Sequence, residues 1–286
     1  MPSSPSPTSS VPSPSSSWQS TAFIGDLPTL WKADPWLPYY NLNGLTDILL
    51  TCDIDWAPDF ATQLVIDLAQ QYGCKITLFA THASDLLQNP PDHVEVGLHP
   101  DFTRVTGKGD FYRKMADLKA LYPNAVGTRS HRNLFGQNIS DCAKQCGLQY
   151  DISTFLWNQP LCQIHQDYNN LTKLCYLWED GIHLDMGLPF NWNSICLHTP
   201  GLKVLNVHPI LMYLNSPSED HRRSVTSQYS DLTIAKKADL DLQVNTGYGI
   251  RNVWIEVLQL IHSQGIKTHL LKEVVARASR PESPAC

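Results

Sequence analysis

Short apolar runs alternate with segments of helical periodicity from residue 47 onward, and this alternation constrains the fold more than any other feature. The runs have the length of buried strands and lie at 47–53, 75–80, 94–99, 125–129, 204–208 and 266–270. Apolar side chains recur at helical spacing at 60–72, 110–121, 138–146 and 250–263. Strands that alternate with helices predict parallel βαβ units, and hence an α/β fold built as a barrel or as an open doubly wound sheet.

The length of the chain suits one such domain. It has 286 residues, 42% of them hydrophobic, and α/β barrels commonly use about 200–250 residues in a single core. We expect residues 47–275 to form this domain. Residues 1–17 are almost entirely Ser, Pro and Thr, which predicts a disordered leader. Residues 18–46 are expected to form an irregular cap, and residues 276–286 a C-terminal tail.

Composition argues against several classes of protein. The formal net charge of -6 lacks the basic footprint of a nucleic-acid binder, so no nucleic-acid partner is expected. No apolar run approaches the length of a membrane span, and the leader lacks the apolar core of a secretory signal. The eight cysteines include no CxxC pair, which favours reduced structural thiols. These features together favour a cytoplasmic protein.

Polar side chains gather where the predicted strands end. In parallel α/β folds the carboxyl ends of the strands form the rim where ligands bind and catalytic groups converge. The polar residues found at these ends are Asp53, Asp55, His99, Arg129, His131 and His208. Their shared position predicts a functional site at this rim.

The first of these groups suggests a metal. Asp53 and Asp55 stand two residues apart, so on an extended strand their side chains face the same side. Two carboxylates on one face repel each other unless a cation or a proton lies between them. Together with His99 they offer the imidazole and carboxylate ligands of a hydrolytic Zn²⁺. Two alternatives stay open: one acid caps the next helix, or His99 is an ordinary core residue.

Several of these segments also match the ordered motifs of a known family. They are Thr51-Cys-Asp-Ile-Asp55, Lys75-Ile-Thr-Leu-Phe79, Glu95-Val-Gly-Leu-His99, Arg129 and Val207-His208-Pro209. In this order they resemble the polysaccharide deacetylases of carbohydrate esterase family four, the chitooligosaccharide-deacetylase homology domain. The pattern is most similar to a divergent subgroup linked to polysaccharide and lipopolysaccharide biosynthesis. The resemblance implies a distorted (β/α) barrel of six to seven strands.

The resemblance also implies roles for individual residues. Asp53 would be the general base, and Arg129 would orient it through a charge-assisted pair. Asp55 and His99 would hold Zn²⁺ or another divalent transition metal. His208 would be the general acid that protonates the leaving amine.

The sequence departs from the family pattern at one metal ligand. The family usually has His-x-x-x-His, but the fourth residue after His99 is Thr103. His131, two residues after Arg129, could restore an Asp-His-His set of ligands. The segment Trp178-Glu179-Asp180-Gly-Ile-His183 is a second source: Glu179, Asp180 and His183 could be ligands, and Trp178 could contact a substrate.

The resemblance implies a metal-dependent hydrolase that removes acetyl groups from an N-acetylated sugar in a glycan or glycan precursor. Two alternatives remain. The same barrel could hydrolyse another non-peptide C–N bond, because the chemistry at the metal would be the same. It could also be a non-catalytic carbohydrate-binding relative, which the loss of histidine at position 103 favours and the presence of Asp53, Asp55, Arg129 and His208 opposes.

Overall fold

The computed structural model describes residues 48–159, 162–197 and 201–278. The leader expected at 1–17 and the cap expected at 18–46 lie outside the described residues, as does most of the tail expected at 276–286. The described strands are β1 Ile48–Asp53, β2 Ile76–Ala80, β3 Val94–Leu98, β4 Gly127–Thr128, β5 Tyr150–Phe155, β6 Ile164–Gln166, β7 Thr172–Tyr176, β8 Trp178–Glu179 and β9 Lys203–Val207. The helices are α2 Asp59–Gln71, α3 Lys108–Leu121, α4 Gln137–Gln145, α5 Asp180–Asp185, α6 Pro209–Leu214, α7 Glu219–Thr226, α8 Lys237–Asp241, α9 Ile250–Ser263 and α10 Leu271–Ala278.

All these strands pair in one sheet, in the order β6-β7-β5-β4-β3-β2-β1-β9-β8. Every pairing is parallel except that between β6 and β7. Helices connect several of the neighbouring strands, as expected of βαβ units. The α/β fold predicted from the alternating pattern is therefore confirmed.

One continuous segment joins the two ends of this sheet. β7 pairs with β5, β8 pairs with β9, and Leu177 alone separates β7 from β8. The backbone N–H of Leu177 donates to the carbonyl of Val204 at 3.0 Å. The segment 172–179 thus closes the sheet into a distorted barrel. If β7 and β8 count as one wall and the antiparallel β6 is left outside the barrel, the described barrel has seven walls, in agreement with the predicted six to seven strands.

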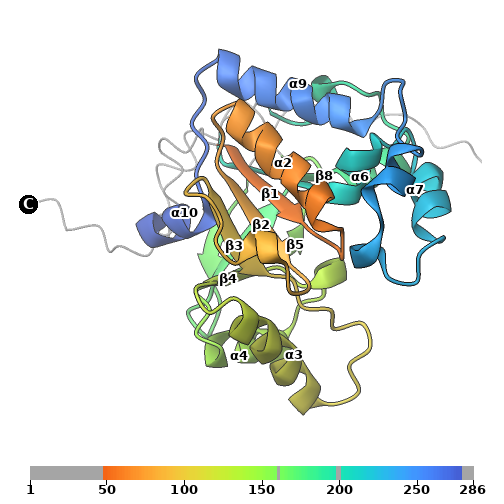
Figure 1. The fold of residues 1–286 in the computed structure, drawn as a ribbon. Helices are drawn as coiled ribbons and strands as arrows, with labels where there is room; N and C mark the ends of the chain where they lie inside the picture. Colours follow the sequence, from red (N-terminus) through yellow and green to blue (C-terminus); the bar gives the residue numbers. More distant parts are fainter. Residues whose placement is uncertain (1–47, 160–161, 198–200, 279–286) are drawn as a thin grey trace, which may run out of the picture. The chain divides into compact units, whose positions relative to one another are not determined.

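The helices cover the outside of this barrel (Figure 1). α2 and α9 lie along the same side of β1, and α3 and α4 lie beside one another near β3 to β5. α2 and α9 each bury an apolar stripe that includes Val65 and Ile66 on α2 and Val253 and Val257 on α9. α6 begins directly after β9 with Pro209 at its first position, where the missing backbone N–H costs little.

The interior of the barrel holds polar side chains because each strand sends alternate residues inward. Near the amino ends of the strands, Glu95 accepts hydrogen bonds from the Tyr150 hydroxyl at 2.8 Å and from the Thr77 hydroxyl at 3.1 Å. The backbone N–H of Lys272 in α10 donates to the same carboxyl at 3.0 Å. A Cβ atom added to Gly127 would lie 1.8 Å from the Tyr150 ring, so only glycine fits there.

The prediction of a strand at 266–270 is wrong. In this segment only Thr268 forms a bridge, with Ile48, and the chain then enters α10 at Leu271. The physical reason is that β1 has little free edge: it pairs with β9 from Ile48 and with β2 from Leu50, so only its start is left for Thr268. The strand predicted at 125–129 is shorter than expected, because only Gly127 and Thr128 pair with the neighbouring strands in a continuous ladder.

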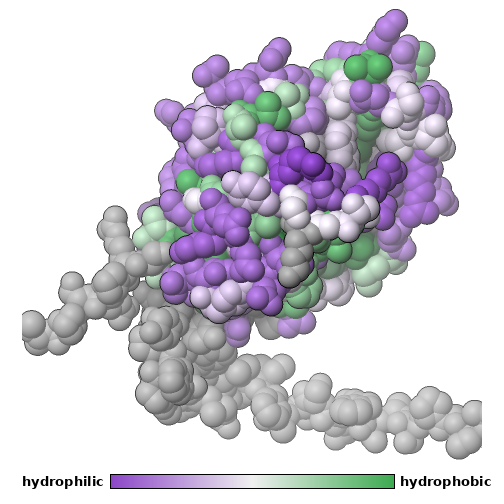
Figure 2. All heavy atoms as spheres, turned by 90° about the horizontal axis from the view of Figure 1, so that it is seen from below, coloured by the Kyte–Doolittle hydropathy of each residue, from purple (hydrophilic) through white to green (hydrophobic). Residues whose placement is uncertain are grey.

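Two further features concern the cysteines and the surface. Seven cysteines within the described residues are free thiols, and no disulfide joins any of them. The face seen from below Figure 1 is mainly hydrophilic, with apolar residues scattered across it in small patches (Figure 2). Among the described residues no helix has both the length and the apolar character that a membrane span requires.

Candidate metal centre and active site

A cavity of about 410 Å³ opens at the carboxyl ends of the strands. It is lined by Asp53, Asp55, Trp56, His99, His131, Arg132, Asn133, Tyr176, Glu179, Gly181, Ile182, Asp185, His208, Ile210, Leu211, Glu219, Arg222, Thr226 and Leu232. These residues come from the ends of β1, β3, β4, β7, β8 and β9 and from the helices that follow. The cavity therefore lies on the rim where the sequence predicts a site.

Three side chains bring their ligand atoms together at the floor of this cavity. Asp55 Oδ1 lies 3.2 Å from His99 Nε2 and 3.1 Å from His131 Nδ1. The two histidine nitrogens lie 3.3 Å apart. Within the described residues this is the group of histidine, cysteine and acidic side chains that could share one metal ion. The separations match ligands about 2.0–2.2 Å from a common ion.

The backbone fixes the positions of these three residues. Asp55 and Trp56 follow β1 in left-handed conformations, with φ of 40° and 56°, and so turn the chain sharply at the rim. The backbone N–H of His99 donates to the carbonyl of Ala80 at 2.8 Å, which continues the pairing of β3 with β2. The ring of His131 packs edge-on against Trp56, with centroids 5.0 Å apart.

The charges of these groups are coupled. Burial raises the pKa of Asp55, but hydrogen bonds with His131 and His99 outweigh it and hold that pKa well below its usual range. Burial lowers the pKa of His99, while the carboxylates of Asp53 and Asp55 raise it, and the net effect is a rise. A metal cation bound here would replace the protons between these side chains and would interact favourably with both histidine nitrogens and with the carboxylate of Asp55.

Asp53 lies on the inner side of this group and is held by two donors. Arg129 Nη1 donates to Asp53 Oδ1 at 3.0 Å, and Asn206 Nδ2 donates to Asp53 Oδ2 at 3.0 Å. Asn206 Oδ1 in turn accepts from Arg129 Nη1 at 2.5 Å. The buried guanidinium is enclosed by the rings of Phe79 and Tyr176, 4.7 and 4.2 Å from its central carbon. This network keeps the carboxylate of Asp53 in one orientation.

His208 also lies near Asp55, with its Nε2 3.8 Å from Asp55 Oδ2. Its Nδ1 lies 2.6 Å from Asp180 Oδ1, and its backbone N–H donates to Asp180 Oδ2 at 2.7 Å. Burial lowers the pKa of His208, but the carboxylate of Asp180, with those of Asp55 and Glu179, raises it well above its usual range. The pairing with Asp180 thus favours the protonated imidazole, and His208 lines the cavity.

The segment 178–183, predicted as a second source of ligands, places only some of its side chains at the cavity. Glu179 lines the cavity, accepts from the Tyr176 hydroxyl at 3.0 Å, and has a pKa raised by burial. Asp180 is fully buried, and its oxygens are taken by His208 and the backbone N–H of Gly181. It therefore orients His208 and is neither a ligand nor a substrate contact.

Trp178 and His183 do not reach the cavity. Both are fully buried, and Trp178 Nε1 donates to His183 Nδ1 at 3.2 Å. Trp178 also stacks on Trp254, with ring centroids 6.4 Å apart. The hypotheses that Trp178 contacts a substrate and that His183 is a metal ligand are wrong, because both side chains belong to the core.

Some residues of the site have no counterpart in the sequence analysis. Asn206 precedes His208 by two positions and so faces the same side of β9, a spacing that could have identified it. Tyr176 lies in β7, a strand that the periodicity does not reveal. Arg132, Glu219 and Arg222 line the cavity from segments outside the strands, where spacing gives no signal.

Residues 50–226 match the family model of the WbmS-like polysaccharide deacetylases. The chain belongs to this family. Sugar deacetylation is accordingly the reaction associated with its members. The match covers the metal-ligand candidates after β1, β3 and β4, the network around Asp53, and His208. The expected resemblance to polysaccharide deacetylases is confirmed.

Solved structures are also similar to this chain. WbmS from Bordetella bronchiseptica, described as a putative polysaccharide deacetylase involved in O-antigen biosynthesis, is 30% identical, with a TM-score of 0.65 over 74% of this chain and 90% of its own. A family 4 carbohydrate esterase from Streptomyces lividans is 12% identical, with a TM-score of 0.44 over 79% of this chain and 92% of its own. A family 4 pseudoenzyme from Bacillus anthracis is 10% identical, with a TM-score of 0.43 over 81% of this chain and 66% of its own. No curated protein sequence matches the chain.

Proposed function

We propose that this protein is a hydrolase that depends on a divalent metal and removes the acetyl group from an N-acetylated sugar. The observation that carries the proposal is the arrangement around Asp55, His99 and His131. The carboxylate of Asp53 lies 3.7 Å from His99, and the imidazole of His208 lies 3.8 Å from Asp55. The similarity to WbmS supports a sugar of a surface polysaccharide or its precursor as the substrate.

The donor set fits a transition metal ion. Two imidazole nitrogens and one carboxylate oxygen are ligands that Zn²⁺ commonly takes at catalytic sites, with room left for water or substrate. Asp55 Oδ1, His99 Nε2 and His131 Nδ1 would hold the ion. When bound, the ion would act as a Lewis acid toward the acetamide carbonyl and make water more acidic.

The side chains of the chain would then divide the proton transfers. Asp53 would accept the proton of the attacking water, since Arg129 and Asn206 hold its carboxylate in place. His208 would donate a proton from Nε2 to the amine that leaves, because Asp180 fixes Nδ1. A base and an acid beside the same ligand group are the two proton-transfer groups that amide hydrolysis needs.

The test measures acetate release from N-acetylated sugars with and without Zn²⁺, together with bound metal. Asp53→Asn should reduce turnover by at least about 100-fold and keep its metal, because a base is lost and the ligands are not. His99→Ala should lose the metal itself. The melting temperature of Asp53→Asn is measured as a control for folding. The substitution removes the carboxylate that pairs with the buried charge of Arg129, and this loss alone could destabilise the protein. Wild-type turnover in both variants would refute the assignment of roles.

A further inference from the structure

The charges that line the cavity are almost all compensated. The charged side chains in the lining, histidines aside, are Asp53, Asp55, Arg132, Glu179, Asp185, Glu219 and Arg222. Asp53 pairs with Arg129 and Asp55 lies against the two histidines, whereas Glu179 accepts a hydrogen bond from the neutral Tyr176 hydroxyl. Asp185 lies 3.7 Å from Arg223. This leaves two arginines whose charge can act on a ligand.

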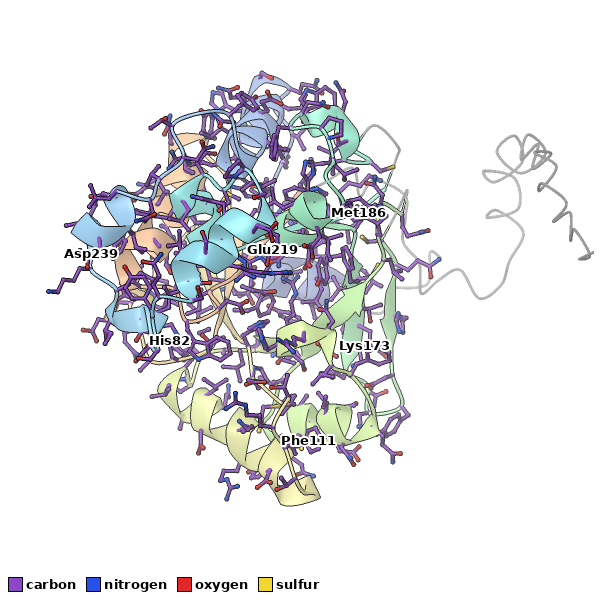
Figure 3. All side chains as sticks on the ribbon, turned by 90° about the vertical axis from the view of Figure 1, so that its right-hand side faces the viewer. His82, Phe111, Lys173, Met186, Glu219 and Asp239 are labelled. Carbon is purple, nitrogen blue, oxygen red and sulfur yellow. The ribbon has the colours of Figure 1, made fainter. Side chains whose placement is uncertain are left out.

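Arg222 is already engaged by an acid. It projects from α7, where its Nε lies 2.9 Å from both carboxyl oxygens of Glu219, and its Nη2 also donates to Glu219. Figure 3 shows Glu219 near the centre of this face of the molecule, on α7. Because Glu219 neutralises Arg222, this pair adds shape to the cavity wall but little net charge.

Arg132 has no such partner. It is exposed, and it makes no hydrogen bond or ion pair with any residue in the described ranges. It directly follows His131 and is one of the residues that line the cavity, so it lies beside the group of metal-ligand candidates. Arg132 is thus a positive charge in the cavity lining that has no opposite charge beside it among the described residues and no part in the proposed deacetylation chemistry.

The backbone holds Arg132 in this place at a conformational cost. Its φ of 56° and ψ of 28° are left-handed, a region that residues with a side chain rarely adopt. Its neighbours fix the turn: His131 N–H donates to the Pro100 carbonyl at 3.1 Å, and Asn133 N–H to the Ser130 carbonyl at 3.0 Å. Asn133 Oδ1 also accepts from the Tyr176 hydroxyl at 2.9 Å. Strained backbone of this kind persists where the surrounding contacts impose it, and it gathers at functional sites.

We infer that the substrate carries an anionic oxygen group and that Arg132 binds it. A guanidinium forms a planar fork that matches a carboxylate or a phosphate with two parallel hydrogen bonds. The substrate class is therefore an N-acetylated sugar that bears a carboxylate or a phosphate, on the same unit or on the adjoining one. This inference rests on the proposed function, because it places the acetamido group at Asp55, His99 and His131.

The experiment measures binding separately from turnover. His208→Asn is a suitable background, because the amide nitrogen of asparagine can keep the hydrogen bond to Asp180 while the proton donor at Nε2 is lost. The Zn²⁺-loaded variant is titrated calorimetrically with N-acetylglucosamine, N-acetylmuramic acid and N-acetylglucosamine 1-phosphate. At least one of the acidic sugars should bind at least about tenfold more tightly than the neutral one, the usual effect of a charge-assisted hydrogen bond. The tighter of the two identifies carboxylate or phosphate as the group.

Two further variants decide whether Arg132 is responsible. Arg132→Gln should abolish the preference for the acidic sugar and leave the affinity for N-acetylglucosamine within about twofold. Arg104→Gln removes the same charge from an exposed arginine that does not line the cavity, and it should change neither affinity. A preference that persists in Arg132→Gln would mean that the anion binds the metal and would overturn the proposal. Failure of both acidic sugars to bind would also overturn it. Acetate release by the wild type, measured in parallel, tests the proposed function alone: binding without release refutes deacetylation and leaves the role of Arg132 standing.

Discussion

At the scale of single residues, His131 supplies the third ligand candidate that the family pattern would lead one to expect at position 103. Thr103 is exposed and its hydroxyl donates to Asp101 at 2.6 Å, so it does not line the cavity. His131 instead follows the neighbouring strand β4, and its Nδ1 lies 3.1 Å from Asp55 Oδ1. A ligand group is defined by where its atoms meet, and two adjacent parallel strands can supply the same atom.

This exchange of ligand positions predicts that His131→Ala lowers the affinity for Zn²⁺ by at least about 100-fold, since even the loss of a residue that only supports a ligand costs about 10–100-fold. Thr103→Ala is the matched control and should bind Zn²⁺ like the wild type. Competition with a metal-sensitive dye measures both affinities. Equal affinities in the two variants would show that His131 is not a ligand.

The residues at strand ends were predictable because a polar side chain after a buried apolar run is conspicuous. Asp53, Asp55, His99, Arg129, His131 and His208 all stand in that position. Asn206 was not predicted as a site residue, because a lone polar residue inside an apolar run resembles one that faces solvent. Arg132 was not predicted either. Its proposed role depends on its left-handed backbone and on the lack of an ion-pair partner among the described residues, and a sequence reveals neither.

At the scale of elements, periodicity predicted the strands that begin βαβ units and failed where pairing depends on a distant partner. The run 266–270 has strand-like composition, but β1 has little free edge left for it. β7 and β8 were not predicted, since their places are set by β5 and β9 and not by local preference. The closing segment of the barrel is therefore the part of the fold that depends most on tertiary context.

The polar layer at the amino ends of the strands predicts a pH effect on stability. Burial raises the pKa of Glu95 above its unfolded value, although hydrogen bonds from Lys272, Tyr150 and Thr77 partly oppose this. The folded state thus binds this proton more tightly. The stabilising contribution of Glu95 is complete below its unfolded pKa and is lost as the pH rises through the higher folded pKa.

Glu95→Gln should therefore gain stability relative to the wild type as the pH rises from about 4 to about 8, by about 1.4 kcal/mol for each unit of raised pKa. Urea unfolding of both proteins at several pH values measures the difference. Glu273→Gln is a suitable comparison, because the pKa of Glu273 is lowered by Lys75 and the opposite trend is expected. A difference between Glu95→Gln and the wild type that does not vary with pH would contradict the argument.

At the scale of the whole molecule, the three ligand candidates join three separate strand-and-loop units. Asp55 follows β1, His99 follows β3 and His131 follows β4. A binding site made by all three residues exists only in the folded barrel, so metal binding and folding are linked. The metal would then stabilise the chain by mass action.

Removal of metal with a chelator should lower the melting temperature, on the order of 5–10 °C when free Zn²⁺ is about 100 times its Kd. Addition of Zn²⁺ should restore the original value. His99→Ala is the control and should melt at the same temperature with and without the ion. An identical melting temperature for chelated and Zn²⁺-loaded wild type would argue against a site of this affinity.

The order of the site residues along the chain also sets the order in which the site can be assembled during synthesis. The ligand candidates are complete once residue 131 has left the ribosome, whereas Asp180 and His208 follow the segment 172–179 that closes the barrel. The groups that would hold the ion are therefore synthesised before the proton donor and the residue that orients it. Because the metal site needs the folded barrel, both parts of the site await the closing segment and β9.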